Sequence, residues 1–339
     1  MRRPTIVDIA RVAGVSKGAV SYALNGKPGV SERTRQRILD IARDLGWAPS
    51  GPARALSPGG RVGAVGLVVD RPAHALGVEP FFMQLVSGIE AELTVAGVDL
   101  VLHVTEDQEA ELAAYRRWAA ERRVDGVILV DLRVDDPRVG EVEELPLPAV
   151  VLGGPEGAGG LPCLHSDEAA AMREVVRYLA ALGHRGIARI AGPEGFRHTR
   201  DRTRAFRAAA EEAGVARTRT VHADYTGEAA TRATRRLLAL AERPTALVYD
   251  NDLMAVAGLG VAREMGVDVP SQLSIVAWDD SVLCGLVRPS LTAIVRDTVS
   301  SGREAARMLL GRVAGDGVVS RQAPPGELHP RASTGPLAP

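Results

Sequence analysis

Short apolar runs alternate with helical stretches along residues 61–339, and this alternation constrains the fold more than any other feature of the chain. The apolar runs cover residues 62–69, 98–104, 124–130 and 147–153, and then 186–192, 217–223, 245–250 and 273–280. The helical stretches within the first set cover residues 82–96, 109–123 and 138–144. Continuous apolar strands separated by helices are typical of parallel sheets covered on both faces. The pattern predicts two doubly wound α/β lobes, joined near Pro162, with a cleft between them.

The first sixty residues differ from the rest in charge. They carry ten Lys and Arg against four Asp and Glu, whereas the other 279 residues carry 31 against 38. A small basic segment on an acidic body indicates a polyanionic partner confined to that segment, although a solvated basic surface would give the same balance.

Several classes of protein are excluded by what the sequence lacks. The first residues contain no apolar run of the kind a signal peptide needs, and no segment approaches the roughly 20 apolar residues that span a bilayer. The cysteines, Cys163 and Cys284, form no metal spacing, and no HExxH, Walker A or GxGxxG motif follows the first strand. We expect a cytoplasmic protein that is not an enzyme and has no metal, cofactor or membrane partner.

The pentapeptide GVSKG, residues 14–18, matches the G-x-S-x-G motif of hydrolases and raises the question whether Ser16 is a nucleophile. A nucleophile in that motif follows a strand. Here the preceding segment instead has the helical spacing i, i+3, i+4, i+7, given by Ile6, Ile9, Ala10 and Ala13. The alternative is that Ser16 caps a second helix.

That alternative predicts three short helices. Thr5 would cap the first with Asp8, Gly14 would supply the turn, Ser16 would cap the second over 17–25, and Ser31 would cap the third. The inward residues of the second and third helices would be Val20, Ala23, Leu24, Ile38, Ile41, Ala42 and Leu45. A helix, a short turn with Gly and a second helix form the helix-turn-helix, whose second helix enters the major groove of DNA.

The run TIVDIARVAGVSKGAVSYALNGKPGVSERTRQRILDIARDLGWAPS resembles the headpiece of the lactose-repressor family of bacterial transcription regulators. The resemblance implies an all-α headpiece over 1–48, with bases read from the start of the second helix. Tyr22 stands where many relatives have Arg, and Ala19 replaces a common Thr, so the bases that are read do not carry over. The DNA-contacting residues implied in the headpiece are Thr5, Ser16, Lys17, Gly18, Ala19, Ser21, Tyr22 and Asn25.

Residues 49–60, rich in Pro and Gly, read as a flexible linker when taken alone. After such a headpiece they resemble the hinge helix of the family, in which Leu56 would wedge into the minor groove and Ala53 would also contact DNA. A helix this short is marginal in water, so we expect the hinge to order on DNA.

The body also resembles that family, in segments such as LGHRGIARIAGP (182–193) and RPTALVYDNDLMAVAGL (243–259). The resemblance implies a two-lobed fold like that of periplasmic sugar-binding proteins, over residues 61–325. Lobe 1 would comprise 61–161 and 296–318, and lobe 2 would comprise 164–290 and 325–332. The crossings would lie near 161–164, 291–296 and 318–325, and the tail 326–339 is expected to be disordered.

Ligands bind at the carboxyl ends of strands in open α/β sheets. Arg202, Asn251 and Asp279 occupy such positions in the family register, and a guanidinium, an amide and a carboxylate suit vicinal hydroxyls. Each has a plainer alternative as a solvated side chain or as part of a helix cap. Phe82 and Trp278 could stack on a sugar ring, although such aromatics more often belong to the core.

Two departures bear on the identity of the ligand. Gly153 and Gly154 stand where many relatives have Asp or Arg, and Ala277 lies in the usual GFDD position, which suggests a shrunken or altered pocket. Together these features predict a homodimeric repressor that binds a palindromic double-stranded operator and responds to a small effector, most simply a sugar. The alternative is a DNA-binding regulator or architectural protein that has lost small-molecule control.

Overall fold

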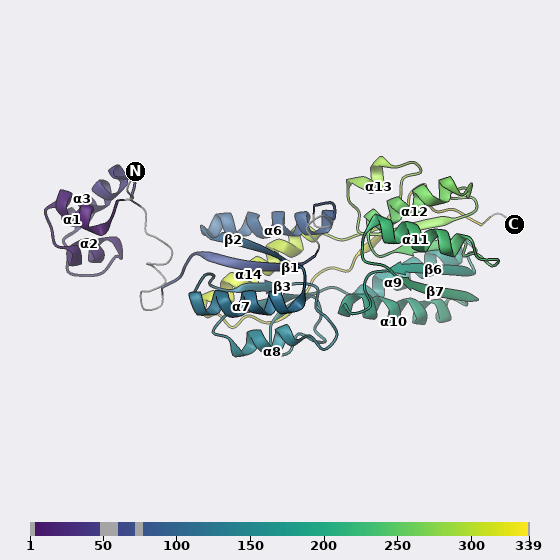
Figure 1. The fold of residues 1–339 in the computed structure, drawn as a ribbon, viewed down its shortest axis with the longest axis horizontal. Helices are drawn as coiled ribbons and strands as arrows, with labels where there is room; N and C mark the ends of the chain where they lie inside the picture. The colour runs from purple at the N-terminus through teal and green to yellow at the C-terminus, as the bar shows by residue number, and fades with distance from the viewer. Residues whose placement is uncertain (1–3, 48–59, 72–76, 338–339) are drawn as a thin grey trace. The chain divides into compact units, whose positions relative to one another are not determined.

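The computed structural model describes residues 4–47, 60–71 and 77–337 of the chain. Contacts divide the chain into two compact units, Met1–Val62 and Gly63–Pro339, each shown in Figure 1. The hinge predicted over 49–60, including Ala53 and Leu56, lies outside the described residues except for Gly60.

The described part of the first unit contains the three predicted helices, α1 (Ile6–Ala13), α2 (Lys17–Leu24) and α3 (Glu32–Asp44). Thr5 and Asp8 form the predicted capping box, and Gly14 ends α1 with φ 63°, a conformation that favours glycine. Ser31 accepts a hydrogen bond from Thr34 N and so caps α3. The buried residues of this core are Ile9, Ala10, Ala13, Val20, Ala23, Ile38 and Ala42.

The second unit has two lobes, each built on a six-stranded sheet. The sheet of lobe 1 is parallel and runs, in spatial order, β2 (Asp99–Thr105), β1 (Ala64–Asp70), β3 (Val127–Leu129), β4 (Ala149–Leu152), β5 (Cys163–His165) and β11 (Arg321–Gln322). The sheet of lobe 2 runs β7 (Arg217–His222), β6 (Gly186–Ala191), β8 (Ala246–Tyr249), β9 (Ser274–Trp278), β10 (Thr292–Val295) and the antiparallel β12 (Glu327–His329).

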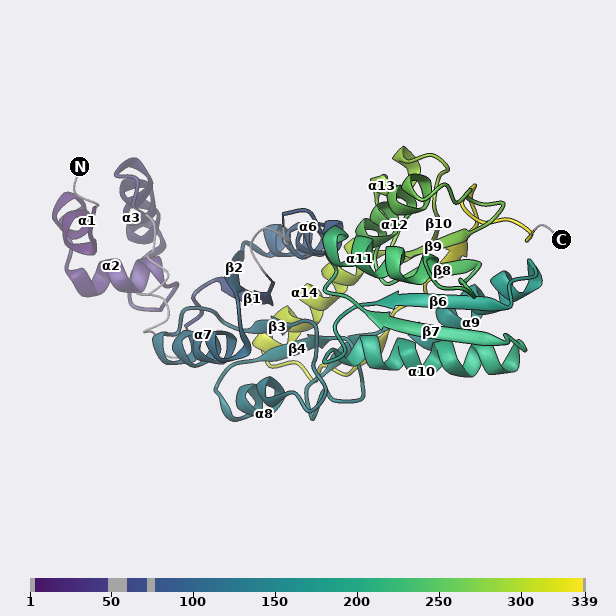
Figure 2. The ribbon, with the colours of Figure 1, turned by 45° about the vertical axis from the view of Figure 1, so that its right-hand side comes forward.

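Helices cover both faces of each sheet, as the apolar runs predict (Figure 2). In lobe 1 they are α6 (Pro80–Ala96) and α14 (Thr298–Ala314) on one face, and α7 (Gln108–Glu121) and α8 (Pro137–Glu144) on the other. In lobe 2 they are α11 (Gly227–Leu238), α12 (Asp252–Glu264) and α13 (Val282–Leu286) on one face, and α9 (Glu168–Ala181) and α10 (Arg197–Glu212) on the other.

Helices α6 and α14 approach each other through two glycines. A Cβ atom at Gly88 would overlap the carbonyl oxygen of Val299, and one at Gly302 would overlap that of Leu85. Because no side chain separates the two backbones there, α14 packs directly on α6.

The chain crosses between the lobes three times, at 166–167, 296–297 and 323–326. The first crossing comes later than the predicted 161–164, because Cys163–His165 forms a short strand of lobe 1 that pairs with β4 and β11. A three-residue strand carries too little periodicity to be distinguished from a connection.

The prediction of a disordered tail is wrong for residues 326–337. Glu327–His329 pairs with β10, and Ser333 is fully buried, where its hydroxyl donates a hydrogen bond to Ile275 O at 2.6 Å. These contacts are made with strands far away in the sequence, so local composition gave no sign of them. Within the parts of the chain that the structure describes, no helix is long and apolar enough to cross a bilayer.

Candidate functional site

Helix α2 exposes one face and buries the other. Lys17, Gly18 and Tyr22 are exposed, whereas Val20 and Ala23 pack into the core of the first unit. Ser16 Oγ accepts a hydrogen bond from Ala19 N at 3.1 Å and therefore caps α2, as the capping alternative predicted. A serine at the start of this helix, preceded by a helix and a turn, lacks the strand that a nucleophile elbow requires.

Among the other predicted DNA-contacting residues, Ala19 and Ser21 lie within α2, Asn25 lies at its end, and Thr5 caps α1. Asn25 ends α2 and donates from Nδ2 to Ser21 O at 2.8 Å. Thr5 Oγ1 donates to Asp8 Oδ2 at 2.7 Å, so its hydroxyl is engaged in the capping box. Ala19 and Ser21 are half-buried.

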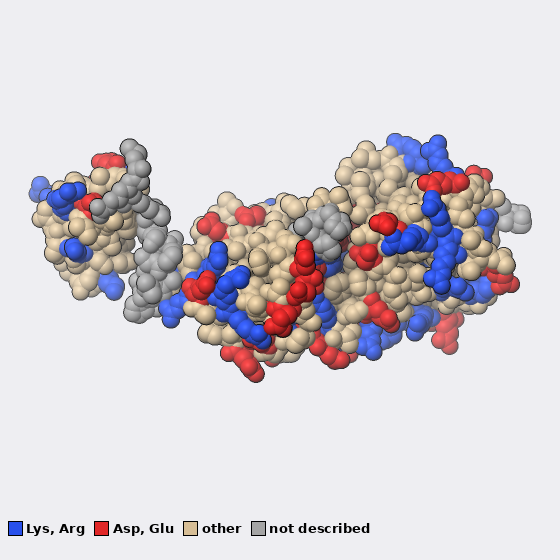
Figure 3. Space-filling model, viewed as in Figure 1, with Lys and Arg blue, Asp and Glu red and all other residues tan. Residues whose placement is uncertain are grey.

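Two arginines of α3 hold the other helices in place. Arg37 donates to Ala13 O at 2.7 Å, and Arg35 donates to Ala23 O at 3.1 Å and to Lys27 O at 2.8 Å. These carbonyls belong to the last turns of α1 and α2 and to the turn that follows α2. Part of the basic excess of the first unit is therefore structural. On the visible face of the second unit, Lys and Arg are interspersed with Asp and Glu (Figure 3).

A cavity of about 1270 Å³ lies between the lobes of the second unit. Both lobes and all three crossings line it, and many of its residues lie one or two positions after a strand: Arg71, Asp131, Gly153, Asp250, Asn251 and Asp279. This is the position that ligands take in open α/β sheets.

Three residues lining the cavity have left-handed backbones. Asp131, Tyr225 and Asp279 have φ of 51°, 67° and 70°. Such conformations are disfavoured for residues with side chains and persist where the surrounding structure imposes them, often at binding sites. Among the described residues, three of the five non-glycine residues with positive φ thus line the cavity.

The structure brings together the three predicted polar ligand residues, Arg202, Asn251 and Asp279, which all line this cavity. Arg202 is 4% exposed and donates from Nε to Glu168 Oε2 at 2.5 Å. Asp279 Oδ1 accepts a hydrogen bond from Arg296 Nε at 2.8 Å. Each of these two side chains is thus oriented by a partner of opposite charge.

Asn251 has a structural role beside its place in the cavity. Its Oδ1 accepts from Met254 N at 2.8 Å, which caps α12, and its Nδ2 donates to Tyr225 O at 3.1 Å. The alternative that a residue of this region caps a helix therefore applies to Asn251, which caps α12.

Neither predicted stacking residue lines the cavity, which corrects the expectation for Phe82 and Trp278. Phe82 is 1% exposed and packs in the core of lobe 1, whereas its neighbour Phe81 lines the cavity. Adjacent helical residues point about 100° apart, so one phenylalanine of the pair faces the core and the other the cleft. Trp278 is fully buried beneath Arg202, whose guanidinium lies 4.4 Å from its ring centre.

Sequence reasoning missed several charged and polar residues of the site. They are Arg71, Glu79, Asp131, Glu168, His198, Tyr225 and Arg296. Arg71 and Asp131 lie just after β1 and β3, so the rule about strand ends could have found them, whereas Glu168 and Arg296 lie beside crossings.

His198 is a neutral member of this group. Burial, with help from Arg202, lowers its pKa to about 4 against the opposing effect of Asp131. Its Nε2 lies 2.6 Å from Tyr225 Oη. An uncharged imidazole next to a phenol can exchange hydrogen bonds with a polar ligand at neutral pH.

Gly153 and Gly154 open the cavity wall at the end of β4. Gly153 has φ 132°, and among the described residues no atom beyond its chain neighbours lies within 4 Å of where its Cβ would be. The cavity wall is therefore open at Gly153. No group of three or more His, Cys, Asp or Glu that could hold a metal occurs in the described portion of the chain.

Comparisons with known proteins match both units of the chain. Residues 5–50 match "Bacterial regulatory proteins, lacI family", and residues 176–334 match "Periplasmic binding protein-like domain". The HTH-type transcriptional regulator CelR of Thermobifida fusca is 34% identical over 319 residues, which cover 93% of each chain. Catabolite control protein A of Priestia megaterium is 30% identical over 310 residues, covering 90% of this chain and 91% of that one.

Solved structures give the same relationship. A CelR–cellobiose complex has 30% identity and a TM-score of 0.74, covering 98% of this chain and 100% of the other. The lac repressor dimer bound to operator and an anti-inducer has 26% identity and a TM-score of 0.85, covering 99% and 100%. The chain belongs to the lacI family of bacterial regulatory proteins and is a DNA-binding transcription regulator, not an enzyme.

Proposed function

We propose that this regulator is a repressor that binds a palindromic operator as a homodimer and responds to a sugar held in the interlobe cleft. The observation that carries the proposal is the convergence of Arg202, Asn251 and Asp279 on one cavity at the strand ends. The protein would act in the bacterial cytoplasm, where its DNA lies.

The DNA half of the proposal rests on the exposed face of α2. A helix-turn-helix presents its second helix to the major groove, and two copies related by a two-fold axis match a palindrome. Lys17 is the exposed cation at the start of that helix and can reach base edges or phosphates. A relative, the lac repressor, was solved as a dimer on its operator.

The sugar half rests on the chemistry of the cavity. Arg202 is a fixed donor and Asp279 is a fixed acceptor, and each can bond two hydroxyl oxygens of one ring. Phe81 offers an aromatic ring in the same cavity. The volume, about 1270 Å³, exceeds the usual range for small-molecule sites, and the related CelR was solved with the disaccharide cellobiose. We therefore favour a sugar of more than one ring.

Ligand-dependent stabilisation of the full-length protein is the direct test. We expect one or more sugars in a panel of mono- and oligosaccharides to raise the thermal midpoint, since a ligand bound only to the folded state stabilises it. Arg202→Ala should abolish that rise, whereas Arg207→Ala, an exposed arginine on the same helix outside the cavity, should preserve it. If no sugar stabilises the protein while operator binding persists, the regulator acts without sugar control and the sugar half of the proposal is wrong.

A further inference from the structure

Arg71 lies just after β1 and is enclosed by aromatic rings from both lobes. It is 6% exposed. Its guanidinium carbon is 5.3 Å from the ring centre of Phe82 in lobe 1, and 4.9 Å and 5.2 Å from those of Phe196 and Tyr225 in lobe 2. All three distances lie within the range of cation–π attraction.

Oxygen atoms of lobe 1 surround the edge of the same guanidinium. Nη2 lies 2.6 Å from Asp131 Oδ2, Nε lies 3.4 Å from Glu79 Oε2, and Nη1 donates to the carbonyl of Asp70 at 2.9 Å. The oxygens therefore lie along the edge of the guanidinium, and the three aromatic rings lie around the same group. Such an enclosure recognises a planar cation. We call it the Arg71 cage: Arg71, Asp70, Glu79, Phe82, Asp131, Phe196 and Tyr225.

A backbone bridge joins the lobes beside the Arg71 cage. Arg197 N donates to Leu132 O at 2.7 Å, and Val134 N donates to Gly195 O at 2.9 Å, so Arg133 and Phe196 pair as in an antiparallel sheet. Leu132 and Phe196 lie next to or within the cage, which couples the bridge to Arg71.

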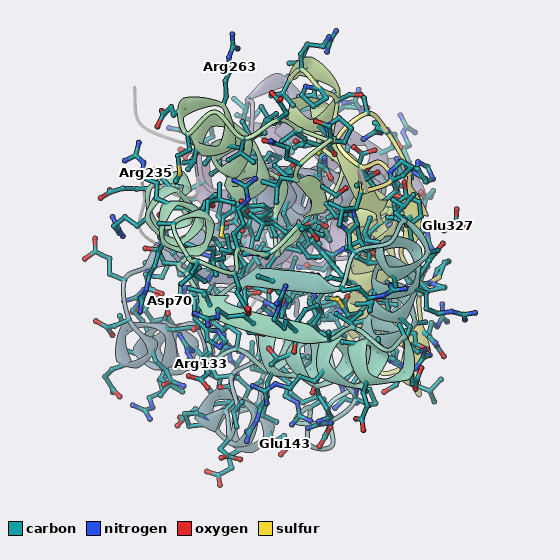
Figure 4. The ribbon with its side chains drawn as sticks, turned by 90° about the vertical axis from the view of Figure 1, so that its right-hand side faces the viewer. Asp70, Arg133, Glu143, Arg235, Arg263 and Glu327 are labelled. Carbon is teal, nitrogen blue, oxygen red and sulfur yellow. The ribbon has the colours of Figure 1, made fainter. Side chains whose placement is uncertain are left out.

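A second ion pair supports the same connection. Arg133 pairs with Asp70 at the end of β1 (Figure 4), and its guanidinium lies 5.9 Å from the Phe196 ring. Two cations of lobe 1 therefore approach one aromatic ring of lobe 2. Separating the lobes would remove Phe196 and Tyr225 from Arg71 and break both hydrogen bonds of the bridge.

We propose that Arg71 is an interlobe latch: a tethered cation that binds an aromatic surface of lobe 2 and so favours the closed cleft. Its contacts within lobe 1 persist when the lobes separate, whereas its contacts with Phe196 and Tyr225 exist in the closed form alone. An interaction shifts a two-state equilibrium by the difference in its free energy between the two states. The contacts of Arg71 with lobe 2 therefore determine how strongly the latch favours the closed cleft. The latch acts on lobe closure without an effector, so its test is independent of the sugar proposal.

Amide hydrogen exchange on the full-length protein tests the latch at the bridge itself. The amides of Val134 and Arg197 are protected when the lobes are joined, and peptides covering 131–135 and 195–199 report them. Arg71→Ala should speed exchange in both peptides by about tenfold or more, the scale of one lost cation–π contact in a desolvated site. Arg71→Lys, which keeps the charge but loses the planar fork, should give an intermediate rate.

Chemical rescue distinguishes a filled cage from a general weakening of lobe 1. Methylguanidinium chloride should restore protection in Arg71→Ala, whereas ammonium chloride at the same ionic strength should not. Arg217→Ala, at an exposed ion pair with Glu242, is the matched control and should leave exchange unchanged. Peptides covering β8, in the core of lobe 2, report whether lobe 2 is still folded.

Three results would overturn the latch. One is that Arg71→Ala exchanges at the wild-type rate in peptides 131–135 and 195–199 while β8 still exchanges slowly. Another is a loss of protection that methylguanidinium does not restore. If Arg71→Ala unfolds lobe 2, fast exchange in β8 will show it, and Arg71→Lys then serves as the test variant. Bridge amides that are as protected in Arg71→Lys as in the wild type would contradict the proposal.

Discussion

Each carboxylate oxygen of Glu168 contacts a different arginine. Arg202 Nε donates to Oε2 at 2.5 Å, and Arg296 Nη1 lies 3.3 Å from Oε1. Glu168 follows the first crossing and Arg296 lies at the second, while Arg202 comes from α10. One carboxylate thus connects two crossings to Arg202, a ligand residue predicted from the sequence, and Arg296 extends the connection to Asp279.

Replacing Glu168 by Gln should weaken effector binding while operator affinity without effector is retained. Burial alone would raise the pKa of Glu168, but Arg202 and Arg296 hold it at about 2, so the carboxylate is charged at neutral pH. Loss of that charge should cost on the order of 1–3 kcal/mol of effector affinity, because Arg202 loses its fixed orientation. Calorimetry with a sugar that stabilises the wild type measures this, with Glu212→Gln on the exposed end of α10 as control. Equal affinities in both variants would contradict the role assigned to Glu168.

Lys17→Ala should reduce specific operator affinity by roughly 1–3 kcal/mol, as expected for a side chain that reads a base edge. Lys17 is exposed at the start of α2, whereas Arg43, paired with Asp40 at the far end of α3, serves as a control of equal charge change. Anisotropy titrations with operator and with scrambled DNA measure the two affinities. An equal loss on both DNAs would make Lys17 a phosphate contact.

Glu79 should make the stability of the second unit depend on pH. Burial raises the pKa of Glu79 to about 7; Arg71 opposes the rise, and Asp131 and Asp279 add to it. A carboxyl whose folded pKa is raised stabilises the fold below its unfolded pKa, and this stability is lost as pH rises through about 7. The free energy of unfolding should therefore fall, by on the order of 3 kcal/mol at most, between acidic and mildly alkaline pH. Urea denaturation across that range should show a flatter profile for Glu79→Gln, and an identical profile would contradict the assignment.

Much of the first unit follows from its sequence, because its determinants are local. The spacing of Ile6, Ile9, Ala10 and Ala13 predicts a helix with one buried face, and Ser16 caps the next helix as expected. Caps, turns and helical periodicity all act within a few residues of each other, so a single sequence contains them.

The cleft is less predictable, because its contacts are made between distant segments. No local pattern distinguishes Phe81 from Phe82, since their placement depends on how α6 packs on the sheet. Arg71 meets Phe196 and Tyr225 from the other lobe, and nothing in the local sequence signals the left-handed backbone of Asp131. Strand ends predict where a ligand site lies, and tertiary packing decides which side chains enter it.

Gly88→Ala should destabilise lobe 1 strongly. A methyl group there would overlap the backbone of Val299, so α6 and α14 would have to separate. Overpacking of this kind typically costs 1–3 kcal/mol or more. Gly140→Ala in α8 is the matched control, since no atom lies within 4 Å of its Cβ position and alanine favours helix, adding roughly 0.5–1 kcal/mol of stability. Similar thermal midpoints for the two variants would contradict the close approach of the two helices.

Selection of binding sites from random duplex DNA by the full-length protein tests the proposed repressor most directly. We expect enrichment of a palindrome whose half-sites lie about one helical turn apart, because two copies of α2 related by a two-fold axis would contact successive major grooves. Binding to the selected sequence should then change on addition of the stabilising sugar in the wild type and not in Arg202→Ala. Failure to enrich any palindrome, or a sugar response that persists in Arg202→Ala, would contradict the link between the recognition helix and the cleft.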